Sequence, residues 1–299
     1  MDLNSKVAVI GAGTMGNGIA HVFAQHGFQV TLIDVSADAL TKAIQTIGTN
    51  LDRLVKKEII RKELKDETLN RISTETSLEV GVAGAGLIVE AATENVELKK
   101  KIFSQMDAAA DPDAILATNT SSISIDLLAQ CTNRPSKVIG MHFMNPVPVM
   151  KLVEVIQGPK TDPSVTQTIV TLSTELGKVP CVVNDFPGFI SNRILMPMIN
   201  EAILSLEEGV AGVSSIDTIM KLGMAHPMGP LQLADLIGLD VCLSILRVLE
   251  SGFNDKKYTP AKLLVELVSE GKLGAKSGEG FYIHTPGSKE LQVNPRFNA

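Results

Sequence analysis

The feature that most constrains this chain is a glycine-spaced loop between a short apolar run and a helical pattern. Lys6–Ile10 ends at this loop, residues 14–26 follow with helical spacing, and Gln29–Ile33 is a second apolar run that ends at Asp34. Strand, helix and strand in this order predict one βαβ unit, and therefore a parallel sheet. The loop consists of Gly11, Ala12, Gly13, Thr14, Met15 and Gly16.

Each glycine of this loop has a physical role in a dinucleotide-binding turn. The first permits a tight turn, the second lets the backbone approach a pyrophosphate, and the third lets helix and strand pack closely, while the helix N-terminus attracts the anion. Asp34 stands where a carboxylate can accept hydrogen bonds from both ribose hydroxyls and would repel a 2′-phosphate. The pattern therefore predicts NAD, rather than NADP, as the cofactor.

A second segment shows that glycine spacing alone is not sufficient. Residues 81–86 fit the same pattern, but they precede an apolar run instead of following one. We therefore interpret them as a connection built of small residues.

The remaining patterns predict two domains. Further strands are expected at residues 87–90, 114–118, 137–143, 152–156 and 180–183, with helices near 98–109 and 163–176. After Asp185 the pattern changes to long apolar-periodic helices near 190–208, 215–222, 230–249 and 259–270. We predict a Rossmann-type, doubly wound α/β domain over residues 1–184 and an all-α domain over residues 185–299.

Composition excludes several classes of protein. The 299 residues are 44% hydrophobic and 20% charged, which is typical of a compact chain, and the net charge of −6 favours neither nucleic acid nor anionic membranes as partners. No apolar stretch approaches the length of a membrane span, and the first residues contain no signal-peptide pattern. The three cysteines, Cys131, Cys181 and Cys242, form no C-x-x-C pair, so we expect a reducing cytoplasm.

A long helix is predicted from Asp38 onward, with apolar residues at helical spacing and basic residues mostly off that stripe. The basic residues near its far end are either a solvated helix face or a patch that meets a phosphate-bearing ligand. They are Lys56, Lys57, Arg61 and Lys62.

The segment from His142 to Glu154 combines a base with a carboxylate. It runs out of one predicted strand, through a turn with two prolines, and into the next strand, and both residues lie six positions from Pro148. If the chain reverses there, the imidazole and the carboxylate face each other, so that the carboxylate can hold the ring tautomer and stabilise the imidazolium. Oxidation of a hydroxyl requires such a base.

The other histidines offer no comparable arrangement. None of the five shows the spacing of a metal-binding motif, so we predict no metal site. The other four are His21, His26, His226 and His284.

Several segments, in one order and spacing over nearly the whole chain, together resemble the L-3-hydroxyacyl-CoA dehydrogenase family, in particular its bacterial 3-hydroxybutyryl-CoA dehydrogenases. The segments that carry the resemblance are residues 11–16, 117–122 (ATNTSS), 142–154 (HFMNPVPVMKLVE), 187–193 (PGFISNR), 227–230 (PMGP) and 278–282 (GEGFY).

The resemblance implies a role for each of these site residues. His142 is the implied base and Glu154 its partner, while Ser121 and Asn192 contact the substrate near the reacting carbon. The residues alone would instead favour a strand-end turn for Ser121 and Asn145 and a helix start for Asn192. The implied NAD contacts beyond the loop and Asp34 are Glu94, Lys99, Ser121, Asn145 and Lys276.

The resemblance also implies an acyl-CoA substrate and a homodimer formed through the second domain. Lys57 would meet a phosphate of coenzyme A, whereas at Asn50 the chain departs from a serine found in the family. Two alternatives stay open, because a Rossmann fold does not fix the chemistry. One is a dehydrogenase of a free hydroxy acid or sugar acid, and the other is a non-catalytic NAD-binding relative.

Overall fold

The computed structural model describes residues 6–285, 287 and 290–297, and it divides the chain into two compact units. The first unit ends at Phe186 and the second begins at Pro187, two residues beyond the division that the sequence pattern suggests. Each unit has its own hydrophobic core, and each is described below by itself. In the described residues, no helix is both long and apolar enough to cross a membrane.

The first unit is built on an eight-stranded sheet with the order β3-β2-β1-β4-β5-β6-β7-β8. The six strands β1 to β6 run parallel, β7 is antiparallel to β6, and β8 is parallel to β7. The bounds are β1 (Lys6–Ile10), β2 (Gln29–Ile33), β3 (Ile72–Glu75), β4 (Ala85–Glu90), β5 (Ile115–Thr118), β6 (Val138–Phe143), β7 (Leu152–Gln157) and β8 (Val179–Asn184).

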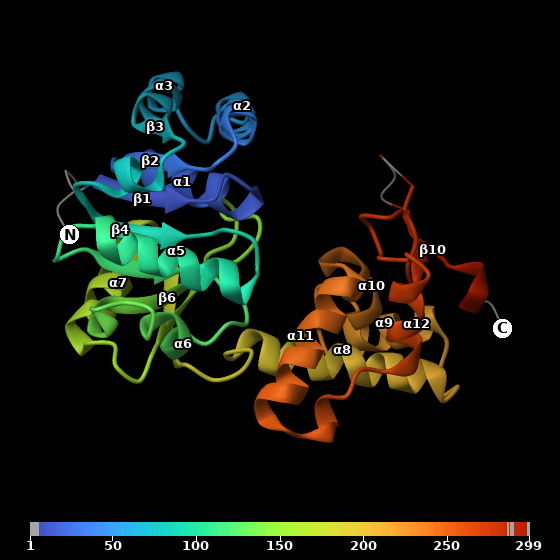
Figure 1. The fold of residues 1–299 in the computed structure, drawn as a ribbon. Helices are drawn as coiled ribbons and strands as arrows, with labels where there is room; N and C mark the ends of the chain where they lie inside the picture. The colour runs from blue at the N-terminus through green and yellow to red at the C-terminus, as the bar shows by residue number, and fades with distance from the viewer. Residues whose placement is uncertain (1–5, 286, 288–289, 298–299) are drawn as a thin grey trace. The chain divides into compact units, whose positions relative to one another are not determined.

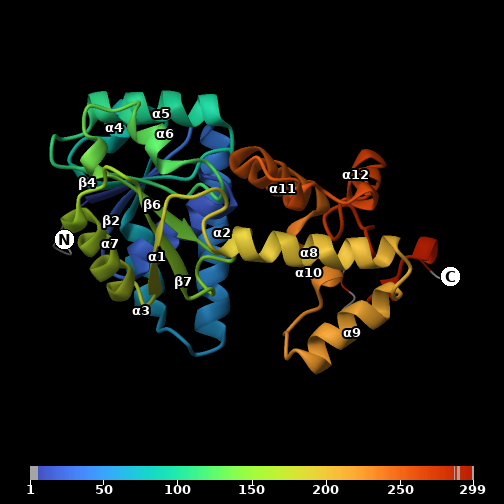
Figure 2. The same cartoon turned by 90° about the horizontal axis from the view of Figure 1, so that it is seen from below.

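Helices cover both faces of this sheet, which confirms the doubly wound prediction (Figure 1). In the view from below, α1 and α7 lie on one side of the strands and α4, α5 and α6 on the other (Figure 2). The helices are α1 (Thr14–Gln25), α2 (Ala37–Lys56), α3 (Lys62–Asn70), α4 (Leu78–Val82), α5 (Val96–Ala109), α6 (Ile125–Ala129) and α7 (Pro163–Glu175), with a 3₁₀ turn at Pro135–Lys137.

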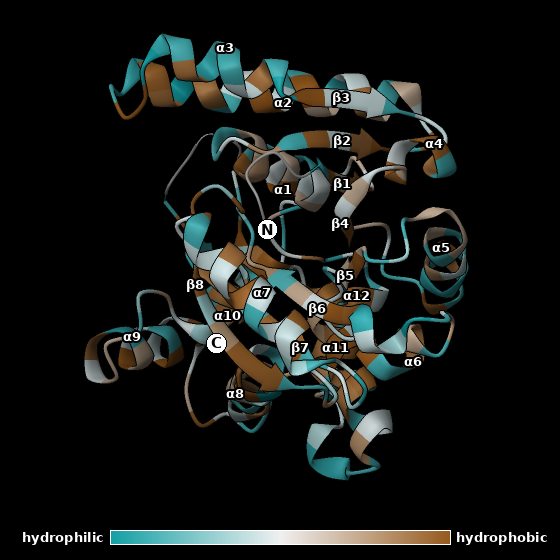
Figure 3. Cartoon of the chain, turned by 90° about the vertical axis from the view of Figure 1, so that its left-hand side faces the viewer, coloured by the Kyte–Doolittle hydropathy of each residue, from teal (hydrophilic) through white to brown (hydrophobic). Residues whose placement is uncertain are grey.

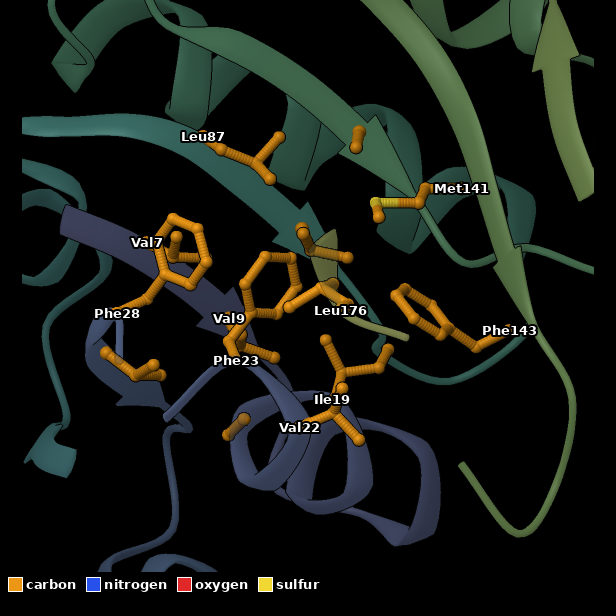
Figure 4. Packing of buried hydrophobic residues seen from close by; sticks show 14 of the residues in the cluster. Val7, Val9, Ile19, Val22, Phe23, Phe28, Leu87, Met141, Phe143 and Leu176 are labelled. Carbon is orange, nitrogen blue, oxygen red and sulfur yellow. The ribbon is translucent and has the colours of Figure 1, made fainter. Parts of the chain in front are cut away.

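Alternation along the strands explains this layering. Val7 and Val9 of β1 join a core with Ile19 and Phe23 of α1, whereas Ala8 belongs to the opposite face of the strand and is also fully buried. Strands that are buried on both faces read as continuous apolar runs, which is why β1 and β2 were visible in the sequence. Figure 4 shows the side chains of α1 interleaved with those of the sheet.

Side chains that cap helix N-termini fix where several helices begin. The Ser36 hydroxyl accepts a hydrogen bond from Ala39 N at the start of α2, and the Asn95 side chain accepts one from Leu98 N at the start of α5. Hydrophilic and hydrophobic turns alternate along the outer helices α2 and α3, as expected for helices with one solvated face (Figure 3).

The predicted long basic helix is wrong in its far part. α2 ends at Lys56, Lys57 is its C-cap, and Glu58 has a positive φ of 55°, so the helix cannot continue. Lys62 instead begins α3. Lys56 and Lys57 are therefore separated from Arg61 and Lys62 by a turn, which the apolar periodicity did not reveal because α3 continues it.

The second unit is helical, as predicted, with two differences. The predicted helix over residues 230–249 is broken at Gly238, whose φ of 105° no helix contains, and a short two-stranded sheet pairs β9 with β10. The elements are α8 (Ser191–Glu207), α9 (Val213–Gly223), α10 (Pro230–Ile237), α11 (Leu239–Phe253), α12 (Lys262–Ser269), β9 (Tyr282–Ile283) and β10 (Gln292–Val293), with 3₁₀ turns at Lys256–Tyr258 and Pro295–Phe297.

Two buried carboxylates hold this second unit together. Asp217 of α9 accepts hydrogen bonds from the first backbone N–H groups of α10 and from the Tyr282 hydroxyl, and Asp235 accepts from Phe281 N and Tyr282 N. A Cβ at Gly229 would lie 2.3 Å from Asp217, and one at Gly280 would lie 2.1 Å from Asp235. Gly229 in the motif at residues 227–230 and Gly280 in the motif at residues 278–282 therefore make room for these carboxylates.

Candidate active site

The glycine loop joins β1 to α1 at the carboxyl end of the sheet, where the strand order changes direction between β1 and β4. Ligands of open α/β sheets bind at such a switch point. Gly13 is the N-cap of α1, and in the described part of the chain no side chain caps this helix. Its first backbone N–H groups are therefore available to an anionic ligand.

The three glycines of the loop differ in what surrounds them. A Cβ at Gly11 would lie 2.6 Å from Ala91 O, and one at Gly16 would lie 1.7 Å from Gly11 O, so both positions are closed by backbone. A Cβ at Gly13 would meet no atom of the described structure within 4 Å. The loop therefore fits a dinucleotide, because the backbone is open to a pyrophosphate at the second glycine alone.

Asp34 lies directly after β2 and is bonded to the loop. Its Oδ2 accepts a hydrogen bond from Ala12 N at 2.8 Å, and its Oδ1 accepts one from Ser36 N at 2.9 Å. These two bonds hold the carboxylate beside the glycine loop. A carboxylate in this place can accept hydrogen bonds from a ribose.

His142 and Glu154 face each other across the antiparallel pair β6 and β7. They are register partners, and the His142 Nδ1 lies 2.8 Å from Glu154 Oε2. His142 is 8% exposed and Glu154 is 2% exposed. An ionised carboxylate can only accept, so Nδ1 is the donor of this bond and the basic nitrogen of the neutral ring is Nε2. The chain reversal that the sequence suggested is confirmed, and the ring can take up a proton beside a carboxylate.

Asn119, to which the sequence analysis gave no role, fastens the strand that carries His142. Its Oδ1 accepts a hydrogen bond from Phe143 N at 2.9 Å, and its own backbone N–H donates to Glu90 O at 2.7 Å. Asn119 follows β5, so it ties the ends of three strands together. The available signal was its place in the residue 117–122 motif, directly after a buried strand.

The loop after β5 is held by Glu94. Its Oε1 accepts from the Thr120 hydroxyl at 2.6 Å, from the Ser121 and Ser122 backbone N–H groups at 3.0 and 3.1 Å, and from the Ser122 hydroxyl at 3.0 Å. Desolvation alone would raise the pKa of Glu94, but the Lys99 ammonium and these hydrogen bonds outweigh it, so the pKa is lowered. Glu94 therefore stays ionised and fixes the backbone around Ser121.

Lys99 is more buried than a residue that touches a ligand is expected to be. Its side chain is 1% exposed, and its ammonium lies 2.6 Å from Glu90 Oε1 and 3.4 Å from Glu94 Oε2. Glu90 is fully buried and its other oxygen accepts from the Thr118 hydroxyl at 2.7 Å. A buried ion pair of this kind is stable only when its members are also hydrogen-bonded, as they are here.

Four more of the predicted site residues lie on other elements. Asn145 is exposed in the turn between β6 and β7, and Lys57 is exposed at the end of α2. In the second unit, Asn192 lies in the first turn of α8, and Lys276 forms an ion pair with Asp240 of α11. The structure thus brings together the glycine loop, Asp34, the Glu94 and Ser121 loop, and the His142 and Glu154 pair at one edge of the first unit's sheet.

Both units match domains of a known protein family. Residues 6–186 match the NAD binding domain of 3-hydroxyacyl-CoA dehydrogenase, and residues 188–284 match its C-terminal domain. A 3-hydroxybutyryl-CoA dehydrogenase of Bradyrhizobium diazoefficiens is 53% identical over 277 residues, which cover 93% of this chain and 94% of that protein. One from Clostridioides difficile is 49% identical, over 93% of this chain and 98% of that protein.

A solved structure agrees with these matches. The crystal structure of (S)-3-hydroxybutyryl-CoA dehydrogenase from Ralstonia eutropha has a TM-score of 0.91 and 48% identity, and it covers 94% of this chain and 99% of that chain. The first unit is therefore an NAD-binding domain. With both units matched and half of the residues identical to those of such enzymes, the chain belongs to the 3-hydroxyacyl-CoA dehydrogenase family.

Proposed function

We propose that this protein interconverts (S)-3-hydroxybutyryl-CoA and acetoacetyl-CoA with NAD as the cofactor. The observation that carries the proposal is the 2.8 Å bond between His142 Nδ1 and Glu154 Oε2 at the sheet edge that also holds the glycine loop. Several relatives that this chain resembles over nearly its full length are named for this substrate. A base held by a carboxylate beside a nicotinamide site is what oxidation of a hydroxyl requires.

In the oxidative direction, His142 Nε2 accepts the proton of the substrate hydroxyl. Glu154 accepts a hydrogen bond from Nδ1, so it keeps the ring in the required tautomer and stabilises the positive charge that the ring acquires. Because Glu154 is buried, its attraction to the imidazolium is stronger than it would be in water. In the reductive direction His142 returns this proton to the 3-oxygen.

The bound NAD supplies an acceptor for the hydride from C3. The first N–H groups of α1 would hold its pyrophosphate, and Asp34 would accept from its ribose hydroxyls. Ser121 and Asn145 would line the nicotinamide end, and Lys276 would add a contact from the second unit. We propose that Glu94 and Lys99 act by holding this site, because Glu94 binds the Ser121 loop and Lys99 is almost fully buried.

Three residues would contact the substrate. Ser121 and Asn192 would contact it near the reacting carbon, and the exposed cation of Lys57 would meet a phosphate of coenzyme A. As the C-cap of α2, Lys57 has its side chain in solvent, which suits a charged and mobile part of a ligand.

The experiment that tests this function follows NADH consumption with acetoacetyl-CoA, with NADPH and free acetoacetate as parallel controls. We expect turnover with NADH and the thioester alone. Turnover on the free acid would favour a hydroxy-acid dehydrogenase instead, and NADH binding without any turnover would favour a non-catalytic relative.

The loop glycines give a matched pair of variants. Gly16→Ala places a Cβ against Gly11 O, so we expect it to lower the free energy of unfolding by about 1–3 kcal/mol. Gly13→Ala meets open space, so the fold should remain, while the added methyl should weaken NADH binding by about ten-fold or more. Thermal unfolding and NADH fluorescence titration measure the two effects. Equal NADH affinity in wild type and Gly13→Ala would place the cofactor elsewhere.

Asp34 is expected to set the choice between NAD and NADP. Asp34→Asn keeps an oxygen for one loop N–H but removes the charge that repels a 2′-phosphate, so the ratio of kcat/KM for NADPH over NADH should rise by about ten-fold or more. The exposed Asp38, in the first turn of α2, provides the control Asp38→Asn, which should leave the ratio unchanged. An unchanged ratio in Asp34→Asn would contradict the ribose assignment.

We also propose that the protein is a homodimer through its second unit and works in the cytoplasm. Large apolar side chains are exposed around a 340 Å³ groove of α8, α9 and α10, including Ile219 at 58% exposed. Such a surface is typical of an interface. Leu222, in the same helix, is 83% exposed. Light scattering should give the dimer mass for the wild type and the monomer mass for Leu222→Glu, and a wild-type monomer would refute the proposal.

The proposed location in the cytoplasm is supported by the three cysteines. They are not in disulfides, which suits a reducing compartment.

A further inference from the structure

A buried lysine binds the turn that joins the His142 strand to the Glu154 strand. Lys178 lies between α7 and β8 and is 7% exposed. Its ammonium donates hydrogen bonds to Val147 O at 2.6 Å and to Met150 O at 2.8 Å. In the described structure no carboxylate lies within ion-pair distance of Lys178, so two backbone carbonyls of one turn are its hydrogen-bond acceptors.

The same turn also rests on the helix that follows the cofactor loop. A Cβ at Gly18 of α1 would lie 2.9 Å from Val147 Cβ, so only a glycine allows this approach. Val147 is 2% exposed although its neighbours Pro146 and Val149 are exposed. Val147 is therefore held between the Lys178 ammonium and α1, and Met150 is a second point at which Lys178 holds the turn.

The backbone on both sides of Lys178 fixes where its side chain starts. Gly177, which follows the C-cap of α7, has a φ of 67°. Lys178 N donates to Ser173 O at 2.9 Å, and Val179 N donates to Lys151 O at 2.8 Å. Lys178 is thus held rigidly beside the first residues of β7. Because its backbone is fixed, the hydrogen bonds of the Lys178 side chain also fix the position of the turn.

A second buried titratable group lies near Lys178. His21 is on α1, three residues after Gly18, and it is fully buried. Burial lowers the pKa of His21 to about 4, so the ring is neutral at pH 7 and adds no second positive charge next to the ammonium. Burial also lowers the pKa of Lys178, but protonated and neutral lysine both carry at least two N–H donors for the two carbonyls.

We propose that Lys178 is a positioning residue for catalysis, which holds the turn between β6 and β7 so that Asn145, His142 and Glu154 keep their places relative to the cofactor helix. This inference rests on the proposed function. Asn145 lies two residues before Val147, and Glu154 lies four residues after Met150. A turn that moves by about 1 Å would misplace these groups, and a misplacement of that size can cost about 10²-fold in rate.

The test compares Lys178→Met with Lys178→Arg and with Lys151→Met. Methionine has a similar length but no donor, arginine restores donors, and Lys151 is an exposed lysine next to the same turn. We expect kcat with acetoacetyl-CoA to fall by about ten- to a hundred-fold in Lys178→Met, to recover at least in part in Lys178→Arg, and to stay normal in Lys151→Met. The Kd for NADH should change by less than about three-fold, because the glycine loop and Asp34 are untouched.

A second variant covers the case in which Lys178→Met fails to fold. Gly18→Ala keeps the lysine and favours helix α1, but its methyl group pushes against Val147. We expect it to remain folded and to lower kcat in the same way. A purely structural role of Lys178 would lower the melting temperature of the variants and leave the kcat of the folded protein unchanged.

An NMR measurement separates this proposal from the proposed function. The Nδ1–H resonance of His142, assigned by its loss in His142→Gln, reports the bond to Glu154 whether or not the protein turns over acetoacetyl-CoA. It should shift or broaden in Lys178→Met and Gly18→Ala and stay in place in Lys151→Met. If the wild type is active, a folded Lys178→Met variant with wild-type kcat overturns the positioning role. If the wild type is inactive, an unchanged His142 resonance in Lys178→Met overturns it. Absent wild-type turnover overturns the proposed function only.

Discussion

His142→Gln is expected to lower kcat for acetoacetyl-CoA reduction by about 10²- to 10⁴-fold, which is the usual contribution of a placed acid or base. Glutamine keeps a polar side chain of similar size at this buried position but cannot exchange a proton with the substrate. The proposed cofactor site is formed by the glycine loop, the start of α1 and Asp34, so the Kd for NADH should remain within about three-fold of wild type. Stopped-flow absorbance of NADH measures the rate, and fluorescence titration measures the affinity.

The exposed His26 at the end of α1 provides the matched control for this variant. His26→Gln should keep wild-type turnover. Near-normal turnover in His142→Gln would refute its assignment as the base, whereas loss of both turnover and NADH binding would indicate that the variant disturbs the fold.

Glu154→Gln is expected to lower kcat by about 10²-fold while the protein stays folded. The glutamine amide can still accept the hydrogen bond from His142 Nδ1, so the ring keeps part of its orientation, but the negative charge that stabilises the imidazolium is lost. The loss therefore falls on the step in which the ring carries the proton. Steady-state kinetics and thermal unfolding together give the two quantities.

Glu175→Gln, an exposed carboxylate in the last turn of α7, is the control for the charge change alone. It should leave kcat and the melting temperature unchanged. If Glu154→Gln keeps its turnover but melts at a clearly lower temperature, Glu154 is a structural residue and the imidazolium must be stabilised by another group.

The elements that the sequence predicted correctly share one property. β1, α1 and β2 combine apolar runs, a loop of fixed glycine spacing and Asp34, so that local residue preferences agree with the final fold. The elements that were not predicted are β3, α4, α6, β9 and β10, which have only two to five residues each. Segments of that length carry too few apolar positions to show a period, and neighbouring strands and helices determine their structure.

Two helices were predicted to be longer than they are, for a different reason. The apolar period continues across the turn at Glu58 and across Gly238, since the residues on both sides face one core. A hydrophobic pattern records which residues are buried, but it does not record a backbone that turns between them. The caps and positive φ angles at these places became visible only in the structure.

One part of the candidate site could be predicted from the sequence, and another part became visible only in the structure. His142 and Glu154 could be paired from the sequence because they are symmetric about a proline turn and lie in adjacent strands. The supports of this pair could not be identified in this way. Asn119, Glu90 and Lys178 reach the site from strands and turns that are distant along the chain, and each is an ordinary polar residue in its own segment.

The sequence by itself determined the glycine loop with Asp34, the two-domain order and the His142–Glu154 hairpin, because each of these depends on residues that are close together along the chain. Only the tertiary structure decided which buried polar groups hold these parts in place: Glu94 on the Ser121 loop, Asn119 on the β6 backbone and Lys178 on the turn. The physical reason is that a buried polar group must find a hydrogen-bond partner wherever the fold provides one, and that partner has no fixed separation in sequence.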